Sequence, residues 1–235
     1  MKCSSRGKTP RMAGRYPQPV RIASVNVGLP SALEFDGRSV VSGIVKAPVA
    51  GPTMVRATNL DGDRQADLRV HGGPDKAVYA YPVQHYAHWT AHLGRELAPY
   101  GYFGENLTVD GMDEAKVQIG DVFRAGSALL QVSQPRVPCF KLAMRMRDHA
   151  FGKPFLPSGR VGFYLRVLEE GEVRDGDPIE LVSAGEGAVS VRRVAWMLVD
   201  ATAEDLDEGA ALPDLPLGWR LRFAERAVAM RRRPA

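Results

Sequence analysis

Apolar and polar residues alternate with a period of two in the middle of the chain. Leu130 and Val132 alternate with Gln131 and Ser133, and the same pattern recurs over residues 161–168. This alternation is typical of half-buried β-strands. Turns rich in glycine, proline and aspartate separate such segments from about Val20 to Val182. We therefore expect a β-rich unit over most of the chain.

Helical spacing of apolar residues is found at fewer places. Val83, Tyr86, Thr90 and Leu93 follow Pro82 at helical intervals, and Gly94 is a stop signal. A second, short helix is predicted over about residues 140–149, directly after a proline-rich segment. Both predicted helices lie within the β-rich unit.

Three further helices are predicted near the end of the chain. Ser190 is a good N-cap for the first, and Thr202 with Asp205 resembles a capping box for the second. Apolar residues recur at helical spacing over residues 219–230 in the third. We expect an α+β, β-rich fold with a flexible tail over 1–18, a β-barrel-like domain over 19–184 and a small three-helix domain over 185–235.

Composition narrows the class of protein. The 235 residues carry a net charge of +4, and much of the positive charge lies near the two ends, which is typical of solvated tails. We therefore expect neither a nucleic-acid polymer nor a membrane as partner, and there is no run of about 20 apolar residues. Two cysteines exclude a disulfide framework, and a working thiol suits the reducing cytoplasm.

Cys139 is the strongest candidate for chemistry. It lies in Gln134-Pro135-Arg136-Val137-Pro138-Cys139-Phe140-Lys141, where prolines prevent an ordinary helix or central strand. Nearby cations, here Arg136 and Lys141, favour the thiolate, which attacks electrophiles and ligates metals. A predicted helix start at this position has the same effect. A buried, inert cysteine is the alternative.

Two glycine-containing loops are further candidates. His71-Gly72-Gly73-Pro74-Asp75-Lys76, with Arg64 upstream, combines backbone amides, two cations and an imidazole, as an anion site with a proton donor would. A glycine-rich hairpin with solvated charges is an equal alternative. Phe103-Gly104-Glu105-Asn106-Leu107 is either a loop that presents hydrogen-bonding groups or an ordinary turn.

Three histidines on the first predicted helix have a spacing that suggests a metal site, but the residues between them do not support one. His85, His88 and His92 share one helical face, but Trp89 stands where a metalloprotease helix has glutamate. We expect these histidines to form a solvent-facing surface of the helix.

Taken together, the motifs resemble the MOSC family, named for the C-terminal domain of molybdenum-cofactor sulfurases, and within it the YiiM-like subfamily. The resemblance runs from about Val20 to Val182 and is carried, in fixed order, by GDR, HGGPDKA, YP, HY, FGENL, GD and QPRVPCFKL. The terminal helices resemble the three-helix domain attached to MOSC in that subfamily. The combination is specific, although no single motif is.

The resemblance implies a barrel-like sheet and a pocket for the molybdenum cofactor, molybdopterin. It implies that Cys139 binds molybdenum or carries sulfur, with His71, Arg64, Asn106 and Arg136 present at matching positions. Related proteins reduce N-hydroxylated small molecules such as hydroxylaminopurines, with electrons from a partner reductase. Cations and amides suit the cofactor phosphate, and the candidates are Arg64, Gly72, Gly73, Lys76, Arg136 and Lys141. Asn106 is a further candidate for binding the cofactor. His71, oriented by Asp75, is the candidate proton donor.

Two alternatives remain open at this stage. In the first, Cys139 carries a persulfide received from a pyridoxal-phosphate desulfurase. In the second, the chain is a binding module whose terminal helices dock a partner or form a homodimer.

Overall fold

The structure is a computed structural model that describes residues 15–16, 18–67 and 71–232. Its strands are β1 (Arg21–Val27), β2 (Ser31–Phe35), β3 (Arg38–Ser42), β4 (Ala47–Pro48), β5 (Thr53–Arg56), β6 (Asn59–Leu60), β7 (Val78–Pro82), β8 (Leu107–Asp110), β9 (Val122–Ala125), β10 (Ala128–Pro135), β11 (Phe163–Glu169), β12 (Gly171–Val173) and β13 (Ile179–Ser183). Its helices are the short η1 (Pro74–Lys76), α1 (Gln84–Leu93), α2 (Phe140–Met146), α3 (Gly152–Phe155), α4 (Val191–Trp196), α5 (Ala203–Ala211) and α6 (Leu217–Arg231).

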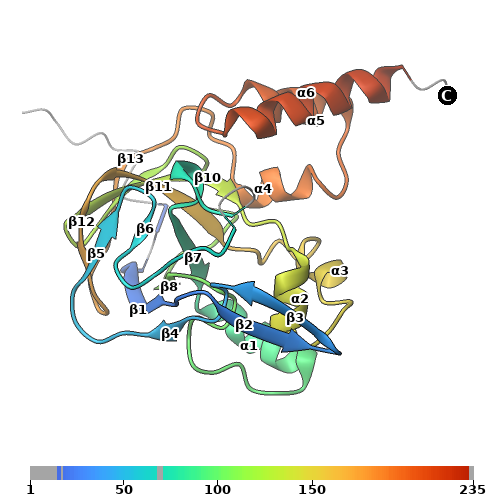
Figure 1. The fold of residues 1–235 in the computed structure, drawn as a ribbon. Coiled ribbons are helices and arrows are strands. Elements are labelled where there is room, and N and C mark those ends of the chain that lie inside the picture. The colour runs from blue at the N-terminus through green and yellow to red at the C-terminus, as the bar shows by residue number, and fades with distance from the viewer. Residues whose placement is uncertain (1–14, 17, 68–70, 233–235) are drawn as a thin grey trace, which may run out of the picture.

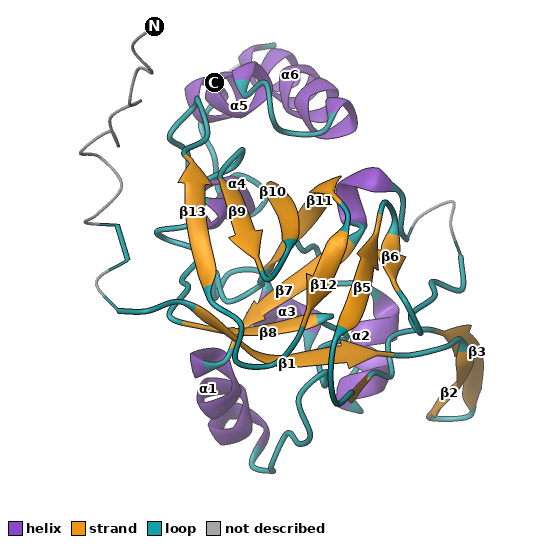
Figure 2. Cartoon of the chain, turned by 90° about the vertical axis from the view of Figure 1, so that its left-hand side faces the viewer, coloured by secondary structure: helices purple, strands orange, loops and turns teal. Residues whose placement is uncertain are grey.

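Eight strands form one strongly curved sheet in the order β13-β9-β10-β11-β7-β8-β1-β4. β7 and β8 run parallel, and the other neighbours are antiparallel. The segment before β13 returns to β1, because Ile22 donates its N–H to the Asp177 carbonyl at 2.9 Å and accepts the Gly176 N–H at 2.8 Å. The sheet therefore closes on itself, as the expected barrel-like domain requires (Figure 2).

Strand β7 is buried on both faces, and its alternation separates two cores. Val78 and Ala80 point into the barrel cluster, whereas Tyr79 and Tyr81 belong to an aromatic cluster outside it. Helices α1, α2 and α3 contribute to this second cluster, and Trp89 of α1 is fully buried there. Burying one such aromatic side chain contributes about 2–3 kcal/mol. The aromatic cluster thus fixes these helices against the strand.

The three terminal helices form close to where caps and apolar spacing predict them, beside one end of the barrel (Figure 1). The Ser190 hydroxyl accepts the Arg193 N–H at 3.1 Å, and Thr202 and Asp205 form the reciprocal capping box. Buried residues of α4, α5 and α6 share one hydrophobic cluster with the barrel interior. The division at residue 184 therefore stays a prediction. No helix in the described part of the chain combines the length and apolarity needed to cross a membrane.

Other predictions meet mixed outcomes. The predicted strand at 130–133 is part of β10, and the one predicted at 161–168 overlaps β11, which begins at Phe163. Helix α1 ends at Gly94, which has a left-handed conformation. Most of the expected tail lies outside the described residues. Within it, Arg15 is not a tail residue, because it donates two hydrogen bonds, of 2.8 and 2.6 Å, to the fully buried carboxylate of Asp121. A buried carboxylate needs such a partner.

Candidate functional site

Cys139 lies where strand β10 ends and helix α2 begins. It occupies the N-cap position of α2 in an extended conformation, with φ of −126°. Its carbonyl accepts the Leu142 N–H at 2.9 Å. Pro138 before it and the helix after it hold the side chain at this junction. The expected helix start beside Cys139 is confirmed.

The thiol faces a cavity of about 600 Å³. Ligand pockets commonly have volumes of about 300–1,000 Å³. The cavity brings together most residues that the sequence nominates, which come from β10, α2 and the loops near residues 64, 72 and 105. Those lining it are Arg64, His71, Gly72, Lys76, Asn106, Arg136, Cys139 and Lys141. The structure therefore brings these residues together around one cavity, although they span more than 70 positions of the chain.

The surroundings of Cys139 stabilise a thiolate. Burial raises the pKa of the thiol, but a hydrogen bond from His71 and the positive charge of Arg136 outweigh it. The Leu142 N–H acts in the same direction, and the pKa falls to about 6. At neutral pH the sulfur is therefore mostly ionised, which is the form that attacks electrophiles and binds metals.

Arg136 is a buried cation with spare hydrogen-bonding capacity. Its side chain is 5% exposed, and its guanidinium lies 5.2 Å from the centre of the Tyr79 ring and 5.8 Å from that of Phe155. Within the described residues, its Nη1 has no hydrogen-bond partner. The pKa of Arg136 is raised: burial lowers it, but the nearby Tyr79, Tyr164, Cys139 and Tyr81, rather than a carboxylate, outweigh that effect. Such a cation suits an anionic ligand.

His71 offers a second spare polar atom. Its Nδ1 is buried and, in the described part of the chain, also lacks a hydrogen-bond partner. The imidazole contacts the thiol of Cys139 and lines the cavity beside Gly72. Gly72 has a φ of 98°, a conformation that glycine adopts without strain. An oxygen-rich ligand in the cavity would satisfy both His71 and Arg136.

A buried ion pair that the sequence did not reveal forms another wall. Lys46 contacts the carboxylate of Asp63, and both side chains are almost fully buried. Burial lowers the pKa of Lys46, and the attraction of Asp63 opposes this effect. Asp63 belongs to the quoted GDR motif, but Lys46 stands between Val45 and Ala47 with no signal of its own. A sequence pattern cannot show which carboxylate forms an ion pair with a given lysine.

Asn106 supports this pair. Its Nδ2 donates to Asp63 at 3.0 Å, and its Oδ1 accepts the Tyr79 N–H at 3.1 Å. The amide therefore lies at the cavity wall but is already bonded to protein groups. Its expected role as a direct cofactor contact stays a prediction.

Two nominated residues lie elsewhere. Asp75 does not orient His71 as expected, because its carboxylate pairs with Arg166 and is not part of the cavity lining. Its side chain, on helix η1, is 42% exposed. Gly73 caps that helix with a φ of 84° and also lies outside the lining.

The predicted histidine surface is partly wrong. His88 and His92 are exposed, but His85 is buried and lies 2.7 Å from the buried carboxylate of Glu114. Helix α1 turns His85, Tyr86 and Trp89 inward. The sequence did not indicate which face of α1 is buried, because Glu114, the partner of His85, lies 29 residues away.

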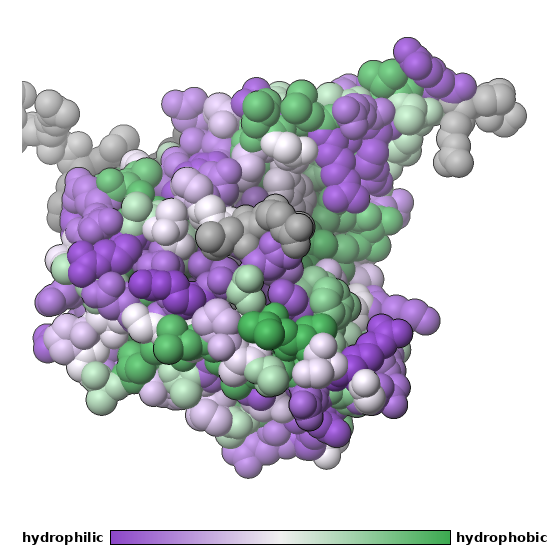
Figure 3. All heavy atoms as spheres, in the orientation of Figure 1, coloured by the Kyte–Doolittle hydropathy of each residue, from purple (hydrophilic) through white to green (hydrophobic). Residues whose placement is uncertain are grey.

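Apolar surface adjoins the site. Val137 and Phe140, on either side of Pro138 and Cys139, are 42% and 58% exposed. On the face shown in Figure 3, hydrophobic residues gather in patches between hydrophilic ones. Apolar side chains are thus exposed on either side of Cys139 in the chain.

Comparisons with known proteins agree with this picture. The model of the MOSC domain matches residues 67–180. The chain is 48% identical to YflK of Bacillus subtilis over 171 residues, covering 73% of this chain and 77% of that protein. It is 39% identical over 149 residues to a protein of Gibberella moniliformis named "Reductase", covering 62% of this chain but 26% of that longer protein.

A comparison with solved structures also finds a YiiM protein. The crystal structure of YiiM from Geobacillus stearothermophilus superposes with a TM-score of 0.75 at 37% identity, and the match covers 89% of this chain and 100% of that one. Fold, motifs and relatives point to one conclusion: the chain belongs to the MOSC domain family and is YiiM-like.

Proposed function

We propose that this chain binds the molybdenum cofactor and reduces N-hydroxylated small molecules of the hydroxylaminopurine type. The observation that carries the proposal is the position of Cys139, whose pKa is lowered to about 6, in a cavity where Nη1 of Arg136 and Nδ1 of His71 have no hydrogen-bond partner among the described residues. A relative named "Reductase" agrees with reductive chemistry. Because the electrons for this reduction must come from another molecule, we also propose an electron-donating partner reductase. We further propose that the chain works in the reducing cytoplasm.

The residues present fit the cofactor. A thiolate is the soft ligand that molybdenum accepts, and Cys139 offers it. Buried Arg136 suits an anionic group of the cofactor, and the lining residues Arg64, Lys76 and Lys141 suit its phosphate. When bound, the cofactor would supply the electrons of the reaction.

The chain's own residues supply the remaining requirements. Converting R–NH–OH to R–NH₂ and water consumes two electrons and two protons. His71 lines the cavity, contacts Cys139 and can hold a proton at Nδ1 for the departing hydroxyl. Val137 and Phe140 lie outside the cavity lining but are exposed on either side of Cys139 in the chain, and they offer apolar surface for the ring of a substrate. Asp75 has no part in this scheme, because Arg166 holds it.

The test compares wild type with Cys139→Ala, both purified from a host that makes the cofactor. We expect stoichiometric molybdenum and pterin fluorescence in wild type and turnover of a hydroxylaminopurine with a chemical reductant. Cys139→Ala should remain folded and lose turnover. Full activity in that variant, or wild type without molybdenum, would overturn the proposal.

A second function uses the same thiolate. The low pKa of Cys139 favours attack on a persulfide of a pyridoxal-phosphate desulfurase, which moves the outer sulfur to Cys139 and releases the donor's thiolate. Mass spectrometry of the protein after incubation with a desulfurase and cysteine would detect one added sulfur. That result, with no molybdenum bound, would favour a sulfur carrier.

A further inference from the structure

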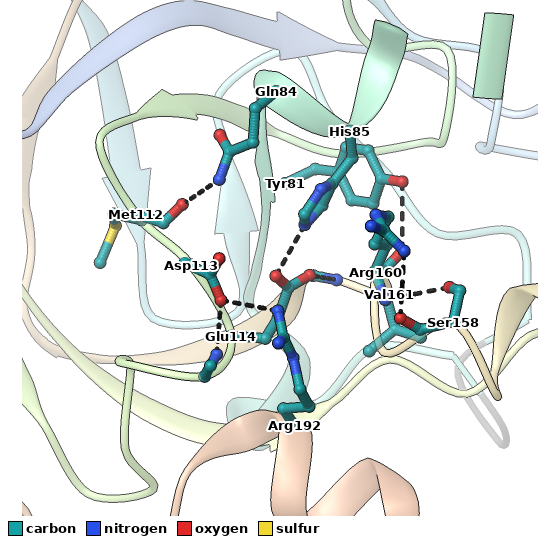
Figure 4. A network of polar contacts seen from close by, with 12 residues as sticks. Tyr81, Gln84, His85, Met112, Asp113, Glu114, Ser158, Arg160, Val161 and Arg192 are labelled. Atoms are coloured by element: carbon teal, nitrogen blue, oxygen red, sulfur yellow. Dashed lines mark hydrogen bonds and ion pairs between the residues drawn. The ribbon is translucent and has the colours of Figure 1, made fainter. Parts of the chain in front are cut away.

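Glu114 is a fully buried carboxylate outside the cavity lining, between helix α1 and the segment that follows α3 (Figure 4). Its Oε2 lies 2.7 Å from Nε2 of His85, and its Oε1 accepts the Gly162 N–H at 2.7 Å. Both oxygens therefore have a partner, as a buried carboxylate requires. The question is what these two bonds hold in place.

Gly162 lies directly against strand β7. It has a φ of 67°, and a Cβ at this position would be 2.5 Å from the Ala80 carbonyl oxygen and 2.8 Å from a ring carbon of Tyr79. A side chain cannot fit there, so the backbone itself packs on the strand. The bond from Gly162 to Glu114 fixes this contact from the outer side.

The segment held by Glu114 in turn supports Arg136. The Gly162 carbonyl accepts the Arg136 N–H at 3.3 Å, and the neighbouring Val161 carbonyl accepts the Tyr79 hydroxyl at 2.7 Å. The Arg136 guanidinium lies over that same Tyr79 ring. Both the backbone of Arg136 and the ring beside its guanidinium therefore depend on two consecutive carbonyls.

The loop that carries Glu114 is also fixed from the other side. The Glu114 carbonyl accepts the Arg192 N–H at 2.9 Å at the start of α4, and the Arg192 side chain binds Asp113 at 2.8 Å (Figure 4). A displaced Glu114 side chain would thus leave its own backbone in place. Loss of the carboxylate should act mainly on Gly162 and on the groups beyond it.

We infer that the His85–Glu114 pair is a positioning element that holds Arg136 beside the sulfur of Cys139 through Gly162 and Val161. Neither residue of the pair lines the cavity. The inference rests on the proposed function, in which Arg136 is the buried cation of the site. A pair that merely stabilises the fold would instead leave the charge near Cys139 unchanged when it is removed.

The test measures the positive charge beside Cys139 in the cofactor-free, full-length protein with Cys3→Ser. Cys139 is alkylated with iodoacetate, which is anionic, and with iodoacetamide, which is neutral. The ratio of the two rates cancels the thiolate fraction and reports the local charge. Arg136→Gln defines the loss of the cation, and we expect its ratio to fall about fivefold, from the attraction of unit charges about 4 Å apart in water.

Glu114→Ala should lower the ratio toward that of Arg136→Gln. Glu114→Gln should keep it near wild type, because the amide oxygen still accepts the Gly162 N–H and the amide nitrogen can donate to His85. His92→Gln, on the exposed side of α1, is the matched control and should change nothing. Leu206→Ala, a buried residue of α5, controls for lost stability alone.

A folded Glu114→Ala protein with the wild-type ratio would overturn the inference. If Glu114→Ala does not fold, His85→Leu decides, because it removes one support and leaves the Gly162 bond. A wild-type ratio of alkylation rates in His85→Leu would also overturn the inference, and a lowered ratio would support it. The labelling needs neither cofactor nor turnover, so its outcome is separate from whether the chain reduces N-hydroxylated compounds.

Discussion

Asn106 donates a 3.0 Å hydrogen bond to Asp63, and through it the FGENL and GDR motifs meet at one wall of the cavity. Asp63 also accepts the Gly28 N–H at 2.9 Å and contacts Lys46. A carboxylate with this many donors is held rigidly in place. The two motifs therefore form this wall jointly. Their residues are far apart in the chain but are hydrogen-bonded to each other in the fold.

We predict that Lys46→Met destabilises the fold strongly. Removing one partner of a buried pair leaves Asp63 uncompensated, at a cost of about 3–5 kcal/mol. Urea unfolding would measure this loss. The double variant Lys46→Met with Asp63→Asn should recover part of it, whereas Lys116→Met, at an exposed position, should have no measurable effect. Equal stabilities of the single variants at positions 46 and 116 would contradict the prediction.

The alkylation of Cys139 should follow a titration near pH 6. The folded thiol has a pKa of about 6, below its ordinary value, so the thiolate is present above that pH and is lost as the pH falls through it. Stopped-flow labelling with iodoacetamide in a Cys3→Ser background measures the curve. His71→Ala removes the hydrogen bond that lowers the pKa and should move the midpoint upward. A midpoint above 8 in the wild type would refute it.

His71→Ala should reduce turnover more than cofactor content. A positioned proton donor contributes about 10²–10⁴-fold to a rate. We expect kcat for a hydroxylaminopurine to fall by that order while bound molybdenum stays near wild type. Elemental analysis beside steady-state kinetics separates the two effects. Loss of metal in proportion to activity would instead make His71 a binding residue.

Asp75→Asn should leave turnover unchanged. The carboxylate pairs with Arg166, is partly exposed and does not line the cavity. A pair of this kind contributes about 0–1 kcal/mol. Activity assays and thermal unfolding would test both expectations. A large fall in kcat would restore the orienting role that the sequence suggested.

Much of the fold was predictable because it depends on local patterns. Period-two alternation located β10 and β11, and Ser190 and Thr202 marked two helix starts. The motifs named the cavity residues for the same reason, since turns with glycine carry a local signal. The short helix α3 had no such local signal in the sequence.

The errors concern long-range partners. Asp75 lies close to His71 in sequence, but its carboxylate pairs with Arg166 on β11. His85 looked exposed because Glu114, which requires its burial, lies on a distant loop. Pairing across such separations is decided by how strands and helices pack, and no single-sequence pattern encodes it.

The basic residues around the cavity have a consequence for kinetics. Arg64, Lys76 and Lys141 border a concave, partly apolar space, where the field of fixed charges extends into solvent for about 8–10 Å at physiological salt. Negatively charged molecules should consequently be captured faster than neutral ones of the same size. Raising the ionic strength would slow that encounter and leave neutral molecules unaffected.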